Sequence, residues 1–383
     1  MDVIYLDNNA TTRPAPEVVE AMLPFLTEYY GNPSSVHRFG QYARKSIDES
    51  RIQVAALIGC RDSDVTFTGG GTESVNSAIR GILANRAPRK KIITSTVEHS
   101  ATRELCQQLA KEGCEIVKIP VDHGGLLDLD ALSNALGDDV ALVSMMWANN
   151  ETGVIFPIEH VTELCRHAGV PVHSDATQAV GKIPIDVSKT LVDALSFAAH
   201  KFHGPKGVGG LYVRRGLRLK PLLIGGPQER QRRGGTENVP GIIGAGKAAA
   251  MALESLPKMS LVAERRDRLE RWILENISET YVNGSPAHRL PNTSNISFAR
   301  LEAEAILLLL SERGICASAG AACSSGSLEP SPVILAMGID PKIGHGAVRF
   351  SLSRYTQDAE IDKTLEILPG VIDRLRAVMP VGV

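Results

Sequence analysis

"VTFTGGGTESVNSAIRGILANR" occupies residues 65–86 and contains three local patterns in succession. Its first four residues are β-branched or aromatic, which predicts a buried strand. Three glycines follow, and apolar side chains then recur at helical spacing through Val75, Ile79 and Ile82. A strand that turns through glycines into an amphipathic helix is the basic unit of an α/β fold.

The same alternation of short apolar runs and amphipathic stretches continues along the chain. Strands are predicted at residues 65–68, 92–96, 115–121, 141–147, 171–175, 194–199 and 209–215. Helices are predicted at residues 72–86, 101–112 and 158–167. Strands that alternate with helices indicate a mostly parallel sheet covered on both faces. We expect this sheet to form a large domain over residues 14–255.

A second region begins near residue 256 and mixes strands and helices without strict alternation. Helices are predicted at residues 259–277, at 302–314 and from about residue 358, and strands at 292–298 and 347–355. This mixture is typical of a smaller α+β domain. We assign that domain to residues 256–383 together with residues 1–13.

The composition excludes several classes of protein. Of 383 residues, 43% are hydrophobic and 22% are charged, which is ordinary for a soluble globular chain. A net charge of -2 gives no electrostatic reason to expect nucleic acid as a partner. The longest apolar run, residues 305–310, is too short to cross a membrane, and no signal peptide is evident. Six irregularly spaced cysteines favour a reducing cytoplasm over a disulfide framework or a zinc site.

Polar residues follow five of the predicted strands. In open α/β sheets, ligands bind outside the carboxyl ends of the strands. The residues at these ends are Gly71 and Thr72, His99, Asn150, Asp175 with Gln178, and His200 with Lys201. The glycine-rich turn suits a phosphate, because backbone N–H groups and the helix dipole favour an anion there. Each residue alone also has a structural interpretation, such as a helix cap, a core histidine or a surface lysine.

Together, these residues match the needs of pyridoxal 5'-phosphate. A lysine forms its Schiff base, an aspartate pairs with its pyridinium nitrogen, and an imidazole stacks on its ring. The segment "HKFHGPKG" offers two lysines. Lys201 directly follows an apolar strand, where burial favours the uncharged nucleophilic amine, whereas Lys206 lies in a glycine–proline loop. We therefore favour Lys201.

The chain resembles a known family, the NifS/IscS-type cysteine desulfurases, which are class-V, fold-type I pyridoxal-phosphate transferases. The resemblance covers nearly the whole length and is closer to the NifS branch. The motifs that carry it are "YLDNNATT" (5–12), "YGNPSSVHRFG" (30–40), "GGGTESVN" (69–76), "VEHSA" (97–101), "MWANNETGVIFPIE" (146–159), "SDATQAVGKIPID" (174–186), "SFAAHKFHGPKGVGGLYVRRG" (196–216), "RRGGTENVPGIIG" (232–244), "AGAACSSGSLEPS" (319–331) and "VRFSLSRYT" (348–356).

The resemblance implies a role for each residue at the strand ends. Lys201 would carry the cofactor, His99 would stack on it, and Asp175 would bind its ring nitrogen. The remaining contacts would come from Asn150 and Gln178 on the O3' side of the ring, and from Gly71, Thr72 and His200 on the phosphate. One departure affects the phosphate: many relatives have "SFSGHK", but this chain has "SFAAHK" and so carries Ala198 in place of a serine.

The resemblance also implies the substrate and two partners. Arg349 would bind the carboxylate of L-cysteine, with Asn150 beside it, because a guanidinium pairs with a carboxylate through two hydrogen bonds. Thr236 would reach the phosphate in the other subunit of a homodimer. An iron–sulfur scaffold protein would accept the sulfur, for nitrogenase or for general cluster assembly.

Cys323 is the expected nucleophile. Its stretch "ASAGAACSSGSLEPS" consists mostly of small residues, unlike the bulky surroundings of a packing cysteine, and so predicts a mobile loop. The resemblance implies that the Cys323 thiolate takes the substrate sulfur as a persulfide and leaves L-alanine. His99 is the hypothesised proton carrier. Whether Cys323 also ligates an iron–sulfur cluster transiently is open.

Two other classes of function stay open. The first is another pyridoxal-phosphate enzyme, an aminotransferase or a selenocysteine lyase, and an aminotransferase has no need of Cys323. The second is a non-catalytic assembly partner for iron–sulfur scaffolds, which would tolerate the loss of Lys201. Alanine formed together with sulfide would separate a desulfurase from both.

Overall fold

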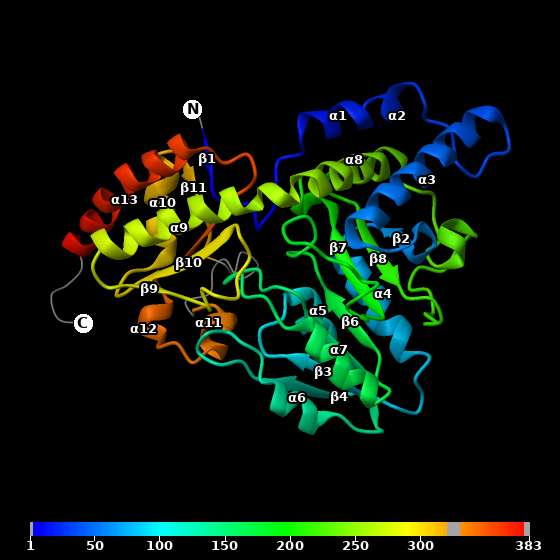
Figure 1. Ribbon diagram of the computed structural model, residues 1–383, viewed down its shortest axis with the longest axis horizontal. Coiled ribbons are helices and arrows are strands. Elements are labelled where there is room, and N and C mark those ends of the chain that lie inside the picture. The colour runs from blue at the N-terminus through cyan, green and yellow to red at the C-terminus, as the bar shows by residue number, and fades with distance from the viewer. Residues whose placement is uncertain (1–2, 320–329, 379–383) are drawn as a thin grey trace.

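The computed structural model describes residues 3–319 and 330–378, which form two parts lying side by side (Figure 1). The larger part contains the main sheet and the smaller part contains the C-terminal helices. Helix α8 (Val239–Ser255) belongs to the larger part, and α9 (Met259–Asn276), the next long helix, belongs to the smaller part. Only the short turn Leu256–Lys258 separates these two helices.

The main sheet confirms the predicted α/β fold. Among the described residues it has seven strands, in the order β2 (Val65–Thr68), β8 (Gly209–Val213), β7 (Ala194–Ala198), β6 (Val172–Asp175), β5 (Val140–Met146), β3 (Lys91–Ser95) and β4 (Glu115–Ile119). All run parallel except β8, which is antiparallel to both of its neighbours. The exception has a simple cause, because the connection over residues 199–208 is shorter than the dozen residues that a parallel crossover needs.

Both faces of this sheet are buried. Adjacent residues of one strand, such as Leu142 and Val143 of β5, belong to two different hydrophobic clusters. Since successive side chains of a strand point to opposite faces, each face has its own core. One core includes residues of α1 (Pro16–Met22), α3 (Arg38–Ile58), α7 (Ile158–His167) and α8, and the other includes residues of α4 (Gly71–Leu83) and α5 (Ser100–Lys111).

The smaller part has its own core, which includes Leu6 from the N-terminal segment and side chains from Met259 onward. Its elements are an antiparallel sheet, a two-stranded parallel pair and three long helices. They are β12 (Ala347–Ser351), β10 (Thr293–Phe298) and β9 (Thr280–Val282), then β1 (Ile4–Tyr5) with β11 (Ile315–Cys316), and α9, α10 (Ala303–Glu312) and α13 (Asp358–Val378). Helix α11 (Pro332–Ala336) instead packs into a core of the larger part. The domain boundaries at residues 14 and 256 stay a prediction.

Most predicted elements occur within a few residues of their expected ends. Three strands end two or more residues earlier than predicted: β4 at Ile119, β8 at Val213 and β12 at Ser351. The first ends because Pro120 follows, and proline has no N–H for the ladder.

Helices α3 and α8, which pack against each other, are not among the elements predicted from the sequence. Helix α8, "VPGIIGAGKAAAMALES", is mostly small and apolar and lacks the broad polar face that marks a surface helix. Its glycines permit the close approach: a Cβ on Gly246 would lie 2.5 Å from the Cβ of Ser50 in α3.

We predict that Gly246→Ala destabilises the protein. Alanine normally stabilises a helix interior relative to glycine, but here the new methyl group would overlap Ser50, so we expect a net loss of roughly 1–2 kcal/mol in unfolding free energy. Gly370→Ala in α13 is the matched control, because nothing lies within 4 Å of a Cβ there. Urea denaturation should lower the midpoint for the first variant only; a stabilised Gly246→Ala would contradict the packing argument.

Candidate active site

A cavity of about 350 Å³ lies at the carboxyl ends of the parallel strands, between the two parts of the molecule. Its lining includes nine residues that the sequence analysis selected: Gly71, Thr72, His99, Asn150, Asp175, Gln178, His200, Lys201 and Arg349. Thr236 lies on an exposed loop outside this lining. Cys323 lies outside the described residues. The strand-end rule therefore located the cavity correctly.

Lys201 stands at the end of a single helical turn that directly follows β7. Its Nζ donates hydrogen bonds to the carbonyl oxygens of Asn9, at 2.6 Å, and Ala10, at 2.8 Å. Lys206, the alternative lysine, is exposed and does not line the cavity. Of the two lysines in this segment, Lys201 is therefore the one placed to meet a ligand.

His99 begins α5 and is held in place by its own helix. Its Nδ1 accepts a hydrogen bond from the N–H of Ala101 at 3.1 Å, so the ring proton of the neutral form sits on Nε2. Burial lowers the pKa of His99, and the positive charges of Lys201 and Arg103 lower it further against the opposing effect of Asp175. Because the one lone pair of the neutral ring is on Nδ1, His99 can accept a proton only when its bond to the Ala101 N–H opens.

Asp175 ends β6 and is buried. Its Oδ1 accepts from the N–H of Thr177 at 3.0 Å. His173 lies two residues earlier on the same face of the strand and bonds to two serine hydroxyls, Ser144 at 2.9 Å and Ser196 at 2.8 Å. Burial lowers the pKa of His173 to about 4, so this imidazole is neutral and brings no positive charge to Asp175.

Glu98, which the sequence analysis passed over, also lines the cavity. Its Oε1 accepts from the hydroxyl of Ser95 at 2.6 Å and from the N–H of Met146 at 3.0 Å, while its Oε2 has no hydrogen-bond partner among the described residues. Burial raises the pKa of Glu98 to about 8, with a smaller contribution from the charge of Asp175. Its position beside His99 at a strand end was the signal that could have revealed it.

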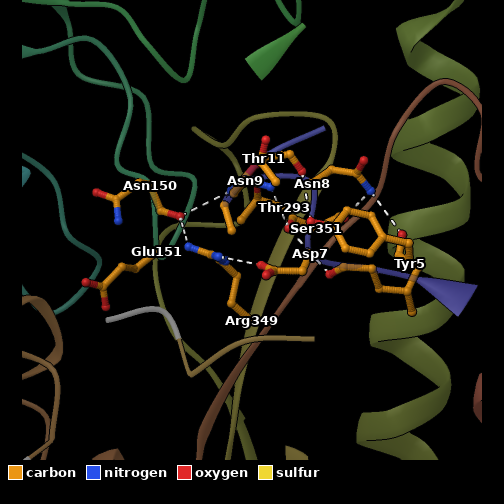
Figure 2. Close-up of polar contacts among 12 residues, drawn as sticks. Tyr5, Asp7, Asn8, Asn9, Thr11, Asn150, Glu151, Thr293, Arg349 and Ser351 are labelled. Atoms are coloured by element: carbon orange, nitrogen blue, oxygen red, sulfur yellow. Dashed lines mark hydrogen bonds and ion pairs between the residues drawn. The ribbon is translucent and has the colours of Figure 1, made fainter. Parts of the chain in front are cut away.

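Arg349 approaches the cavity from the smaller part. It lies on β12 and is 2% exposed. Its Nη2 donates to Oδ1 of Asp7 at 2.7 Å, and its Nη1 donates to the carbonyl of Asn150 at 2.9 Å (Figure 2). The guanidinium and the Lys201 amine therefore come from different parts of the molecule.

Asn9 is the second residue that sequence reasoning missed. Its backbone N–H donates to Oγ of Ser351 at 2.9 Å, and its Nδ2 donates to Oγ1 of Thr293 at 2.9 Å and to the carbonyl of Asn150 at 3.2 Å (Figure 2). Its carbonyl accepts from Lys201. The N-terminal segment therefore connects the smaller part to the proposed cofactor lysine.

Lys182 and Gln178 extend this network. Nε2 of Gln178 donates to the carbonyl of Asn9 at 2.9 Å. Nζ of Lys182 donates to Oε1 of Gln178 at 2.6 Å and to Oδ1 of Asn9 at 2.8 Å. Lys182 is buried, a rare state for a lysine, and the sequence gives no periodic signal for it.

The N-terminus of α4 forms another wall of the cavity. A Cβ on Gly71 would lie 3.3 Å from Oγ1 of Thr177 and 3.5 Å from Cβ of Ala198. Ala198 itself lines the cavity, so the serine that it replaces in relatives would stand at this wall. Nearby, Nδ1 of His200 bonds to Oγ1 of Thr11 at 3.0 Å, and burial lowers the pKa of His200 to about 4.

The described residues on either side of residues 320–329 lie at the cavity. The N–H of Arg349 donates to the carbonyl of Ser318 at 2.6 Å. On the other side, Oγ of Ser331 donates to Oε2 of the buried Glu151 at 2.5 Å, and Pro332 lines the cavity. The described residues that flank this segment therefore contact Arg349 on one side and Glu151 on the other, and both of these line the cavity.

A metal site and a membrane-spanning helix are both absent from residues 3–319 and 330–378. No group of three or more His, Cys, Asp or Glu side chains is arranged to hold a metal ion there. No helix in this portion of the chain is long and apolar enough to cross a membrane.

Comparison with known proteins first gives the class. Residues 4–364 match the aminotransferase class-V family. The match includes every described residue of the cavity lining, from Asn9 to Arg349. The chain therefore belongs to the class-V aminotransferase family.

Individual relatives place it beside the cysteine desulfurases of that family. The chain is 53% identical over 380 residues to cysteine desulfurase 2 of Trichormus variabilis, covering 99% of this chain and 96% of the relative. It is 52% identical over 379 residues to cysteine desulfurase NifS of Azotobacter vinelandii, with coverage of 98% and 94%. This similarity agrees with the resemblance found in the sequence motifs.

Solved structures give the same result. A NifS-like protein, 38% identical, matches with a TM-score of 0.91 and covers 98% of this chain and 100% of its own. A structure described as SspA in complex with cysteine, 32% identical, matches with a TM-score of 0.82 and covers 92% of this chain and 99% of its own.

We predict that Glu98 makes the protein less stable in alkali. A carboxyl whose pKa is about 8 when folded and 4.5 when unfolded contributes stability that is complete below about pH 4.5 and is lost as the pH rises through 8. Between about pH 6 and pH 9, the wild type should therefore lose roughly 2–3 kcal/mol of unfolding free energy more than Glu98→Gln.

Urea denaturation across this pH range measures the difference. Glu264→Gln, at an exposed position on α9, is the control and should follow the wild type. Parallel pH profiles for the wild type and Glu98→Gln would show that Glu98 is already ionised at neutral pH.

Proposed function

We propose that this chain is a pyridoxal 5'-phosphate-dependent cysteine desulfurase. It would convert L-cysteine into L-alanine and hold the sulfur as a persulfide on Cys323, for delivery to iron–sulfur cluster assembly. The observation that carries the proposal is the convergence of an amine, a carboxylate, an imidazole and a guanidinium on one cavity: Lys201, Asp175, His99 and Arg349.

The lining fits the proposed cofactor chemically. The volume of the cavity lies within the range of small-molecule sites. Lys201 would bind the cofactor covalently, Asp175 would accept a hydrogen bond from its ring nitrogen, and His99 would lie against its ring. The cofactor supplies an electron sink for a carbanion. The neutral His173 leaves the Asp175 carboxylate available for a protonated ring nitrogen.

The phosphate would lie against the N-terminus of α4, with Gly71 and Thr72 as donors and His200 beside them. Asn150 and Gln178 would contact the O3' side of the ring. Because Ala198 supplies no hydroxyl at this wall, the chain would rely more on the backbone N–H groups of the helix and on Thr236 from a second copy.

The remaining steps are assigned to the chain's own side chains. Arg349 would bind the substrate carboxylate, for which its planar donors are suited, with Asn150 beside it. The Lys201 amine, once exchanged for the substrate amine, would move the proton at the substrate Cα. His99 would take the proton of the Cys323 thiol at Nδ1, after its bond to the Ala101 N–H opens, because the thiolate is the reactive form.

A homodimer is part of the proposal. Thr236 is exposed in this chain and would complete the site of the partner copy. An exposed apolar surface on and beside α1, α2 (Pro24–Thr27) and α3 supports an interface, since monomers rarely expose such clusters. Its residues are Leu23, Leu26, Tyr30, Val36, Phe39 and Tyr42.

The sulfur acceptor is proposed to be an iron–sulfur scaffold protein. The similarity to cysteine desulfurase NifS of Azotobacter vinelandii supports the desulfurase activity, and both nitrogenase and general cluster assembly stay open as the destination of the sulfur. A transient iron–sulfur ligand role for Cys323 belongs to the same proposal. A reducing cytoplasm suits the five described cysteines, all of which are free thiols.

Cys323→Ala tests the proposal directly. The variant should still bind pyridoxal 5'-phosphate and keep its yellow colour, because Lys201 and Asp175 are unchanged. Alanine and sulfide production from L-cysteine should fall more than about a hundredfold, because the nucleophile is absent. Cys316→Ala is the matched control and should form both products at the wild-type rate. Full desulfurase activity in Cys323→Ala would refute the assignment, and a keto-acid product from the wild type would favour an aminotransferase.

His99→Gln tests the proton carrier. The change removes the proposed proton carrier, so persulfide formation should slow by about a hundredfold, as is typical when general acid–base catalysis is lost. His37→Gln is the matched control: Nδ1 of His37 caps α3 by accepting from the N–H of Gly40 at 3.1 Å, as His99 caps α5. Rapid mixing with L-cysteine, followed by mass analysis of Cys323, measures the rate. An unchanged rate in His99→Gln would exclude His99 as the carrier.

A further inference from the structure

We propose that Lys182 is a positioning residue that holds the Asn9 carbonyl against the amine of Lys201. The inference rests on the proposed function, because Lys201 must be the residue that bonds to pyridoxal 5'-phosphate. Lys182 would not touch the cofactor or the substrate. It would act through Asn9 and Gln178.

The first support is the hydrogen-bond geometry. Nζ of Lys182 donates to Oδ1 of Asn9 and to Oε1 of Gln178, at 2.8 and 2.6 Å. Nε2 of Gln178 and Nζ of Lys201 both donate to the Asn9 carbonyl, at 2.9 and 2.6 Å. Lys182 therefore contacts Asn9 directly at its side-chain oxygen and, through Gln178, supports the donor that bonds the Asn9 carbonyl.

The second support is the burial of Lys182. Burying an amine is costly unless its donors are satisfied, so a buried lysine outside the ligand cavity needs a structural or functional reason. Burial, together with the positive charges of Lys201 and Arg349, lowers the pKa of Lys182 well below its ordinary value. Two of the Lys182 donors are satisfied in this buried position by the side-chain oxygens of Asn9 and Gln178.

The third support is the position of Lys182 relative to the large cavity. Among the described residues of the lining, Lys201 is present and Lys182 is absent. A separate cavity of about 20 Å³ is lined by both lysines, so Lys201 borders both cavities and Lys182 only the small one. That space holds no more than a water molecule, so Lys182 can support Lys201 but has no route to a ligand of the cofactor's size.

Lys182→Met tests the inference, because methionine keeps the length of the side chain and removes both donors. Apoprotein is mixed rapidly with pyridoxal 5'-phosphate, and visible absorbance separates the initial capture from the first-order formation of the covalent bond. We expect bond formation to slow about tenfold, the effect of losing one or two ordinary hydrogen bonds, while the capture constant stays within about twofold.

Lys182→Gln is the second variant, because its amide can still donate to one of the two acceptors. It should be slowed less than Lys182→Met, and it carries the test if the methionine variant fails to fold. Lys189→Met is the matched control, since Lys189 is an exposed lysine that pairs with Asp186, and it should match the wild type in both steps.

Three results would overturn the inference. The first is a rate of bond formation in both Lys182 variants within about twofold of the wild type. The second is a parallel loss of capture, bond formation and urea midpoint, which would indicate general packing. The third is borohydride reduction and peptide mapping that find the cofactor on Lys182. Mapping that finds it on neither lysine would instead refute the proposed function, so the two failures are distinguishable.

Discussion

Asn9 is buried where the two parts of the molecule meet, and its backbone and side-chain polar groups are all hydrogen bonded. On one side it bonds to Ser351, Thr293 and Asn292 of the smaller part. On the other it bonds to Lys201, Gln178, Lys182 and Asn150 of the larger part. Because a buried amide that loses a partner costs more than an ordinary hydrogen bond, the network strongly favours one relative placement of the two parts. The shape of the cavity depends on that placement.

The ionisable groups around the cavity are mostly held uncharged by burial. The pKa of His99, His173 and His200 is lowered and the pKa of Glu98 is raised. These three imidazoles and this carboxyl therefore contribute little to the net charge around the cavity at neutral pH. A ligand entering the cavity would meet mainly the fixed charges of Asp175, Lys201 and Arg349, whose field is strong because little water screens it.

The sequence predicted the parts of the site that follow a local rule. Strands and amphipathic helices have periodic signals, and the carboxyl ends of parallel strands share one edge, so these two rules suffice to place His99, Asp175 and Lys201 together. They do not place Asn9 and Lys182 at the site, because most partners of these residues are far away in the chain. A single buried polar residue also gives no repeating sequence pattern that could reveal it. Helix α8 was missed for a related reason: a helix buried on several sides has no clear polar face. The role of each site residue stays a prediction, as does everything that concerns Cys323 itself.

The turn Leu256–Lys258 between α8 and α9 has a consequence for the choice of substrate. Arg349 belongs to the smaller part and Lys201 to the larger. The distance between the proposed carboxylate-binding group and the proposed amine-binding group therefore depends on the angle between the two parts. An α-amino acid places its amine and carboxylate on one carbon, and a longer amino acid such as a β-amino acid separates them further. Changes at this turn would therefore alter which spacing of the two groups fits, without touching a residue proposed to bind either one.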